Sequence, residues 1–210
     1  MADKAEPLEL IVVSDFVCPW CYLGLQEIEK IRREYDVELR FAPYLLDPST
    51  PPEGKPRRPM TREGDAPTDM EKRAEGLGIK FSRGRTMTSN SLLAHQAAEY
   101  AAEHDFEPAF HQAMFKAYFT DLRDIGTIET VVDIGSSVGM DAGELRSALE
   151  AGTYRQQVED GLDWAREIGV SGVPTFVFDG QYGVVGAQEY SVFENMMNRL
   201  AVPKRDSTAK

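Results

Sequence analysis

The sequence predicts an α/β fold in which a strand-helix-strand unit and a later strand-strand-helix unit are separated by an all-helical insertion. Three observations support this prediction. A β-branched apolar run near the N-terminus has the composition of a buried strand, and helical periodicity follows it directly. The middle of the chain shows helical periodicity, and two short strand patterns return near the C-terminus. We therefore expect one sheet assembled from two distant parts of the chain.

The first unit occupies the N-terminal part of the chain. Leu8–Val13 reads LELIVV, with a proline before it and polar residues after it, as expected for a strand buried in a sheet. Between Tyr22 and Tyr35 apolar side chains recur at helical spacing among charged ones, which predicts an amphipathic helix. Val37–Leu46 returns to strand-like alternation. Asp47–Pro67 is rich in proline, which excludes a helix or a central strand and predicts a loop.

Between about residue 68 and residue 168 we expect helices only. Thr68, Thr127 and Asp141 stand at N-cap positions, and glycines stand where several of these helices should end. The expected helices are Asp69–Gly76, Ser89–Glu103, Phe106–Phe119, Ile128–Val138, Asp141–Ala151 and Tyr154–Ile168.

The strand pattern returns at Thr175–Phe178 and Tyr182–Val185. Asp179-Gly180 between them favours a tight hairpin turn, so the two strands should be antiparallel neighbours. Glu189–Leu200 predicts a last amphipathic helix, and a polar tail, Lys204–Lys210, is expected to be disordered. We expect residues 1–65 to form the N-terminal half of the sheet domain with its proline-rich loop, and residues 66–165 to form the helical insertion. Residues 166–201 should form the C-terminal half of the sheet domain, and residues 202–210 the tail.

Composition limits the function classes. A chain of 210 residues with 42% hydrophobic content can bury a core without help from disulfides. Its formal charge of -12 repels phosphate backbones and anionic membranes, so we expect no nucleic acid and no membrane as partner. The polar, acidic start does not match a secretory signal, which predicts a cytoplasmic location. In a reducing compartment, a lone cysteine pair is more often catalytic or metal-binding than structural.

Cys18 and Cys21 are the two cysteines of the chain, and they enclose Pro19 and Trp20 where the first helix should begin. Proline is favoured at the first helical position, because its missing N–H needs no partner there. The free N–H groups and the dipole of a helix N-terminus stabilise a thiolate, so we expect a lowered pKa for Cys18. Residues three apart on a helix are also close enough to form a disulfide.

Two other readings of the cysteine pair are open. A structural zinc site needs four ligands, and the wide spacing of the histidines does not supply them; they are His95, His104 and His111. A static disulfide would close a loop too short to remove much entropy from the unfolded chain. We therefore favour a redox pair and expect no bound metal.

Several motifs together resemble a known family. Besides the cysteine pair, they are Ser171-Gly172-Val173-Pro174-Thr175 and the segments Ser89–His95, Phe115–Phe119 and Asp179–Gln188. With them the chain, from Leu8 to about Leu200, resembles the DsbA family of thioredoxin-fold oxidoreductases. The resemblance is nearest to the FrnE-like branch, which is related to the 2-hydroxychromene-2-carboxylate isomerases and the kappa-class glutathione transferases.

The resemblance implies a thioredoxin-like fold split by the helical insertion, with Pro174 in a cis peptide that faces the cysteines. It further implies that Cys18, expected to be the more exposed thiol, forms a mixed disulfide with the substrate and that Cys21 resolves it. The backbone of Val173 would pair with an extended substrate segment, and Pro19 and Trp20 would border the same site. Alternatively, the Val173-Pro174 segment has a structural role alone, as a turn before a strand.

The expected function is that of a thiol-disulfide oxidoreductase or isomerase acting on protein thiols and disulfides or on small thiols. No bound cofactor is implied, and glutathione is a candidate co-substrate. One alternative is a glutathione-dependent isomerase or transferase, although those isomerases commonly carry serine at the position of Cys18 and have no use for a second thiol. A non-catalytic scaffold would leave both thiols unexplained. The oligomeric state is open, with a homodimer as one candidate.

Residues around the cysteines have alternative roles. Many thioredoxin-fold enzymes carry a buried carboxylate where this chain has Val12. Asp15 is a candidate for the same proton-transfer role, although we expect it to be a solvated turn residue. Asn90 either caps a helix or contacts the substrate. His95 is expected to be packed or solvated without a chemical role. The aromatic residues that form either an apolar collar for substrates or part of the core are Phe16, Trp20 and Tyr22.

Overall fold

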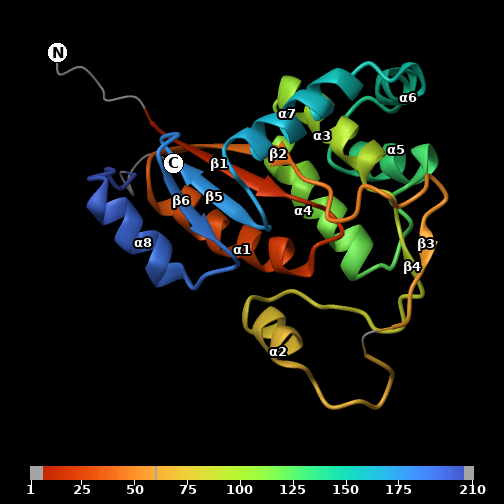
Figure 1. Cartoon of the computed structure of the whole chain (residues 1–210), viewed down its shortest axis with the longest axis horizontal. Coiled ribbons are helices and arrows are strands. Elements are labelled where there is room, and N and C mark those ends of the chain that lie inside the picture. The colour runs from red at the N-terminus through yellow and green to blue at the C-terminus, as the bar shows by residue number, and fades with distance from the viewer. Residues whose placement is uncertain (1–6, 60, 206–210) are drawn as a thin grey trace.

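The structure, a computed structural model, describes residues 7–59 and 61–205 and has a mixed sheet between layers of helices (Figure 1). The strands follow the order β2-β1-β5-β6. β1 (Leu8–Ser14) pairs in parallel with β2 (Val37–Pro43) and antiparallel with β5 (Thr175–Phe178). β5 pairs antiparallel with β6 (Tyr182–Val185). The prediction of one sheet built from both ends of the chain is confirmed.

Helices cover both faces of this sheet. α1 (Pro19–Glu34) and α8 (Tyr190–Arg199) contact each other on one face, where their apolar side chains enclose Phe176 and Phe178 of β5. α7 (Arg155–Glu167) packs against β2 on the other face. A Cβ atom at Gly161 would lie 2.6 Å from the Pro43 ring, so glycine allows α7 to approach β2 closely. The burial of both faces explains the continuous apolar runs in β1 and β5.

The remaining helices form a layer that continues from α7. α3 (Leu92–Glu103) lies at its centre and packs against the neighbouring helices α4 (Glu107–Phe119), α5 (Ile128–Ser137), α6 (Ala142–Ala151) and α7. Thr127 and Asp141 each accept a backbone N–H at the start of α5 and α6, as the sequence predicted. The hydrophobic core of this layer includes Cys18 and Cys21, so the cysteines lie where the helical layer meets the sheet domain.

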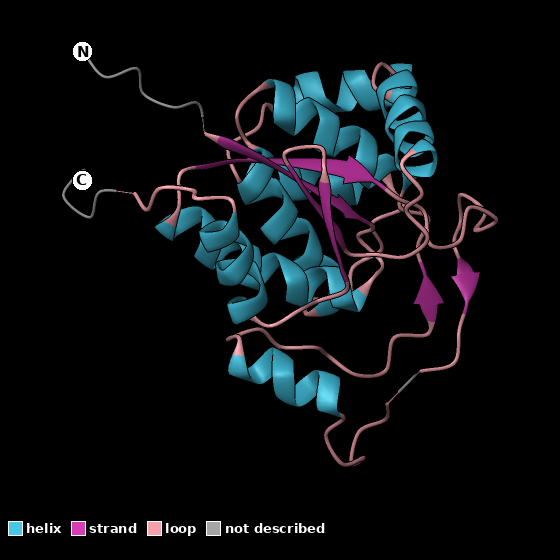
Figure 2. Cartoon of the chain, turned by 60° about the vertical axis from the view of Figure 1, so that its left-hand side comes forward, coloured by secondary structure: helices cyan, strands magenta, loops and turns pink. Residues whose placement is uncertain are grey.

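α2 (Asp69–Gly76) lies apart from the other helices, at one end of the molecule (Figures 1 and 2). Thr68 begins it with the expected cap, since its side chain accepts the Glu71 N–H and the Glu71 side chain accepts the Thr68 N–H. Arg73 of α2 donates to the carbonyl oxygens of Ala187 and Gln188, just before α8. These bonds tie α2 to the sheet domain across a long sequence separation.

The expectation that the chain after residue 68 forms nothing but helices is contradicted by a short pair of strands. β3 (Lys55–Pro56) and β4 (Met87–Thr88) form a small antiparallel sheet, too short for any alternation to be visible in the sequence. β2 ends at Pro43 rather than Leu46, because its partner β1 ends at Ser14, opposite Pro43, and the Leu46 N–H donates to the Asp15 carboxylate. α1, by contrast, begins at Pro19, the first helical position predicted from the cysteine motif, before the apolar periodicity that starts at Tyr22.

Part of the predicted disordered tail is ordered. Lys204 forms an isolated bridge with Tyr35, and Arg205 donates to the carbonyl oxygens of Tyr35 and Val37. The expectation of disorder is therefore wrong for these two residues, while 206–210 lie outside the described residues.

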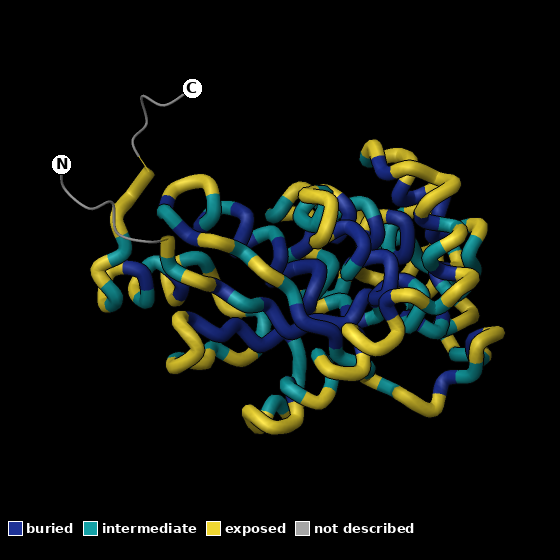
Figure 3. The backbone as a smooth tube through the Cα atoms, turned by 90° about the horizontal axis from the view of Figure 1, so that it is seen from above, coloured by how far each residue is buried: buried dark blue, intermediate teal, exposed yellow. Residues whose placement is uncertain are grey.

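Figure 3 shows the buried backbone running through the centre of the molecule. Within the described ranges, no helix has both the length and the apolarity that crossing a membrane requires.

Candidate active site

The two cysteines lie at the start of α1, as predicted. Cys18 is the N-cap residue, and Pro19 takes the first helical position. The N–H groups of Cys21 and Tyr22 donate to the Cys18 carbonyl at 3.1 and 3.4 Å, and the Cys18 N–H donates to the carbonyl of Asp15 at 3.0 Å. Both cysteines are free thiols. A strand, a short loop and a proline-started helix thus place Cys18 at the positive end of the helix dipole.

The segment before β5 faces this helix start. The Val173-Pro174 peptide bond is cis, as the resemblance implied. The Cys18 thiol donates to the Val173 carbonyl oxygen, with 3.6 Å between sulfur and oxygen. Gly24 makes this approach possible, because a Cβ atom there would lie 2.9 Å from Phe176 Cζ and 3.1 Å from Pro174 Cγ. The close contact of α1 with β5 therefore sets the position of Cys18 against Val173.

The expected difference in exposure between the two thiols is wrong. Cys18 is 3% exposed and Cys21 2%, because Cys18 packs against the Val173 backbone and within the core of the helical layer. Trp20, by contrast, is 45% exposed and projects beside the pair. Phe16 and Tyr22 are buried, so of the aromatic residues proposed as a collar only Trp20 faces solvent.

The protonation behaviour of the two thiols differs sharply. Hydrogen bonding from the Cys21 side chain lowers the pKa of Cys18, and the backbone N–H groups of Cys21 and Trp20 add to this against the opposing effect of burial. Burial raises the pKa of Cys21 well above its ordinary value, and the neighbouring Cys18 raises it further. One thiol is therefore prepared to ionise while the other, one helical turn away, holds its proton.

Asp15 is not the solvated turn residue that the sequence suggested. It is 1% exposed, and its carboxylate accepts the N–H of Leu46 at 2.8 Å and the N–H of Val17 at 3.3 Å. The His95 Nε2 atom of α3 lies 3.6 Å from the same carboxylate. Asp15 thus joins the loop before Cys18 to the end of β2 and to the helical layer. Its charge also opposes ionisation of Cys18.

His95 and Asn90 have structural contacts on the same side. The His95 ring is buried, and its Nε2 atom lies 3.1 Å from the carbonyl oxygen of Tyr44. Asn90 accepts the Leu92 N–H at 2.9 Å through its side-chain oxygen and donates to the Thr50 carbonyl at 2.7 Å. α3 begins at Leu92 rather than Ser89, with Ser91 as the N-cap residue, and Asn90 forms a turn just before it instead of capping the helix. Val12 is buried in the sheet core and supplies no carboxylate.

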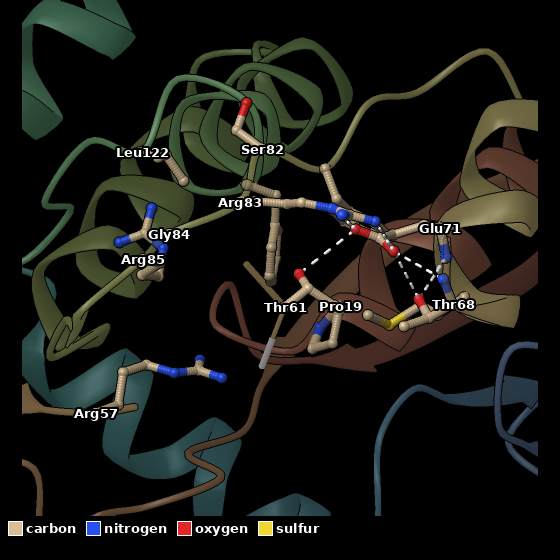
Figure 4. A pocket seen from close by; sticks show the side chains of 13 residues that line it. Pro19, Arg57, Thr61, Thr68, Glu71, Ser82, Arg83, Gly84, Arg85 and Leu122 are labelled. Carbon is tan, nitrogen blue, oxygen red and sulfur yellow. Dashed lines mark hydrogen bonds and ion pairs between the residues drawn. The ribbon is translucent and has the colours of Figure 1, made fainter. Parts of the chain in front are cut away.

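Sequence reasoning missed the arginines near the cysteines. A cavity of about 200 Å³ is bordered by Pro19, Arg57 and Arg85 (Figure 4). Arg57 belongs to the short basic run Lys55-Pro56-Arg57-Arg58, and Arg85 follows Arg83 in the segment before β4. Nothing in the linear pattern places either near Pro19, because the contact depends on the path of the loops around β3 and β4. In the part of the chain that the structure describes, no three His, Cys, Asp or Glu side chains gather as a metal site would need.

Comparison with known proteins agrees with this geometry. Residues 9–198 match the family model described as DSBA-like thioredoxin domain. YwbO of Bacillus subtilis strain 168, a protein described as uncharacterized, is 29% identical over 189 residues, which cover 89% of this chain and 94% of YwbO.

Two solved structures share the arrangement. The probable DsbA oxidoreductase SCO1869 of Streptomyces coelicolor has a TM-score of 0.80 at 24% identity, covering 96% of this chain and 94% of its own. A 2-hydroxychromene-2-carboxylate isomerase has a TM-score of 0.71 at 18% identity, covering 92% and 96%. At these identities the structural likeness establishes the fold alone. The family match covers the strand, the cysteine helix, the helical layer and the hairpin in their observed order. The chain therefore belongs to the DSBA-like thioredoxin domain family.

Proposed function

We propose that this chain is a thiol-disulfide oxidoreductase or isomerase that acts through a mixed disulfide on Cys18. The observation that carries the proposal is the pair of free thiols at the start of α1, one of them against the Val173 carbonyl, and it is supported by a pKa lowered for Cys18 and raised for Cys21. A nucleophile needs a thiolate at neutral pH, whereas a resolving thiol must stay protonated until the substrate is attached. The pair has this division of roles before any substrate binds.

The proposed reaction balances on these two residues. The Cys18 thiolate attacks one sulfur of a substrate disulfide, the substrate S–S bond breaks, and the released sulfur leaves with the bonding electrons and takes up a proton. Cys21 then loses its proton and attacks Cys18 in the mixed disulfide, so that the second substrate sulfur leaves as a thiolate. The substrate gains two electrons and the cysteine pair becomes a disulfide. The reverse sequence oxidises a dithiol.

The charge of Cys18 provides a trigger for the second step. The Cys18 thiolate raises the pKa of Cys21, so the resolving thiol keeps its proton while the nucleophile is free. Formation of the mixed disulfide removes that negative charge, and the pKa of Cys21 must then fall. Hydrogen bonding to Ser14 and to the backbone of Asp15 already acts in this direction. The resolving thiol is thereby activated only after the substrate has been captured.

The surroundings of Cys18 support a peptide substrate. The Val173 carbonyl lies beside the thiol, and its backbone is the proposed pairing partner of an extended segment that carries the reacting cysteine. Trp20 presents an exposed ring at the same helix start for an apolar side chain. We propose protein thiols and disulfides as the main substrates, small thiols such as glutathione as co-substrates, and the cytoplasm as the location.

Reduction of insulin by dithiothreitol tests the proposal. We expect the wild-type protein to accelerate insulin precipitation and Cys18→Ser to lose the acceleration, because the attacking thiolate is gone. Cys21→Ser should accumulate mixed disulfides with cellular proteins, visible on non-reducing gels, since no second thiol resolves them. Equal acceleration by wild type and Cys18→Ser would refute the proposal. Failure of Cys21→Ser to trap any adduct would refute the assigned roles.

The isomerase alternative predicts another pattern. Glutathione-dependent isomerisation of an aromatic chromene acid would have no need of Cys21. Turnover of such an acid that survives in Cys21→Ser, together with no insulin reductase activity in the wild-type protein, would favour isomerisation over disulfide exchange. The divergent pKa values of the two thiols have no function in that reaction, and this favours the redox assignment.

A further inference from the structure

Two cavities flank the start of α1 and share one arginine. The first, of about 200 Å³, is bordered by Pro19 and by an apolar wall that includes Phe81 and Phe119. The second, of about 300 Å³, is bordered by Val17, and Arg57 lines both cavities. Because Val17 and Pro19 flank Cys18 in the chain, both cavities adjoin the backbone that carries the nucleophile.

The charged groups of the first cavity fall into two sets (Figure 4). On one side, Arg83 binds both carboxylate oxygens of Glu71 at 2.8 and 2.9 Å, which lowers the pKa of Glu71 to about 2. This cation is therefore already paired. On the other side lie Arg57 and Arg85, and among the described residues neither has a carboxylate within 4.0 Å.

Contacts within the protein hold these two arginines at the cavity. The Arg85 guanidinium lies 3.7 Å from the centre of the Tyr118 ring and donates to the Tyr118 carbonyl oxygen. The backbone N–H of Arg57 donates to the Thr86 carbonyl at 2.8 Å, which places Arg57 across the small β3–β4 sheet from the Arg85 segment. The tertiary structure thus brings two guanidinium groups to one side of the cavity.

Holding two cations together in this way is electrostatically unfavourable. Burial lowers the pKa of Arg85, Tyr118 opposes this, and the charge of Arg57 lowers the pKa further, with a smaller opposing effect from Asp124. The chain as a whole has a net charge of -12, so acidic side chains that could pair with an arginine are common elsewhere on it. A bound carboxylate would relieve the repulsion between the two arginines. Among common side chains, a carboxylate best matches the planar guanidinium group, because it accepts two parallel hydrogen bonds from it.

We infer that this cavity binds an acidic side chain of a polypeptide substrate, carried close to the cysteine that Cys18 attacks. This inference rests on the proposed function and names its substrate class. Arg57 and Arg85 would contact the carboxylate, while Phe81 and Phe119 would cover its aliphatic stem or an apolar neighbour. A polypeptide fits better than a small thiol because two adjoining cavities offer room for more than one side chain.

Matched peptides test this inference. Three short peptides, identical except for glutamate, glutamine or lysine on both sides of a single cysteine, are prepared as mixed disulfides with pyridinethiol. The Cys18 thiolate attacks the peptide sulfur, the bond to the pyridyl sulfur breaks, and pyridinethione leaves with the electron pair and is measured by its absorbance. The same derivative of glutathione provides the small-molecule comparison. Rates are measured for wild type, Arg57→Gln/Arg85→Gln and Arg58→Gln.

At low salt we expect the glutamate peptide to react about fivefold faster than the glutamine peptide, the ratio that roughly 1 kcal/mol of binding energy gives. The lysine peptide should react more slowly than both. The ratio should fall to about 1 in Arg57→Gln/Arg85→Gln. Arg58→Gln should keep the wild-type ratio, because Arg58 is exposed and borders neither cavity.

Three outcomes would overturn the inference while leaving the proposed function standing: equal rates for all three peptides, an acidic preference retained in the double variant, or a gain confined to the glutathione derivative. If the double variant does not fold, added salt on the wild-type protein replaces it. Screening should then reduce the preference for the glutamate peptide, and a ratio independent of salt would overturn the inference. Failure of every peptide to react with Cys18 would instead refute the proposed function.

Discussion

Replacing Gly24 with alanine would test how closely the cysteine helix packs against β5. A Cβ atom at this position would lie 2.9 Å from Phe176 Cζ and 3.1 Å from Pro174 Cγ, whereas unstrained carbon atoms sit at about 3.5 to 4.0 Å. Phe176 is fully buried and packs against the Phe193 ring, so it has little room to retreat. Overpacking of this kind costs about 1 to 3 kcal/mol, against about 1 kcal/mol that alanine returns through its helix propensity.

The expected net effect of Gly24→Ala is therefore a loss of about 1 kcal/mol in the free energy of unfolding, measured by urea denaturation. Gly76→Ala in α2 is the matched control, because nothing lies within 4 Å of a Cβ atom there. That variant should be neutral or more stable. Equal stabilisation by both substitutions would refute the close packing that sets Cys18 against Val173.

Three other predictions follow from the site. The ultraviolet thiolate absorbance of the reduced wild-type protein should show Cys18 titrating below the ordinary thiol value, well separated from Cys21, and a first titration at or above that value would contradict the assigned role. Asp15→Asn should lower the pKa of Cys18 further, because the carboxylate charge opposes its ionisation, and should cost about 2 kcal/mol of stability by weakening two buried hydrogen bonds. An unchanged thiol titration would show that Asp15 has no electrostatic effect. Burial raises the pKa of Glu107 to about 7, so the folded state holds a proton that the unfolded state loses above about 4.5. Stability should thus fall as pH rises through this window, and Glu107→Gln should flatten that dependence in urea unfolding. An identical pH dependence in both proteins would contradict the raised pKa.

Local patterns predicted the regular elements well. The two C-terminal strands lie where their β-branched and aromatic runs placed them, and the Asp179-Gly180 turn has positive φ at both residues, as a tight hairpin needs. Helix ends at Thr127 and Asp141 were predictable because capping is a contact between residues a few positions apart. The β3–β4 pairing was not predictable, because two-residue strands separated by thirty residues leave no periodicity.

The place of the cysteine pair was predictable for the same reason. The spacing of Cys18, Pro19 and Cys21 along one helix start is visible in the linear sequence. The exposure of Cys18 and the burial of Asp15 were predicted wrongly, since both depend on segments far away in the chain. Leu46 donates one hydrogen bond to the Asp15 carboxylate, and the His95 ring of the helical layer lies 3.6 Å from the same carboxylate.

The sequence by itself determined the order of the main strands and helices and the place of the cysteine pair at a helix start, because these follow from short-range backbone preferences and motif spacing. That the Val173-Pro174 segment faces the pair was implied by the family resemblance. The tertiary structure alone decided which charges surround the pair. Arg57 and Arg85 meet beside Pro19 only after the β3–β4 loops are placed. Electrostatic interactions depend on distances in space, and those distances are set by the packing of the whole chain.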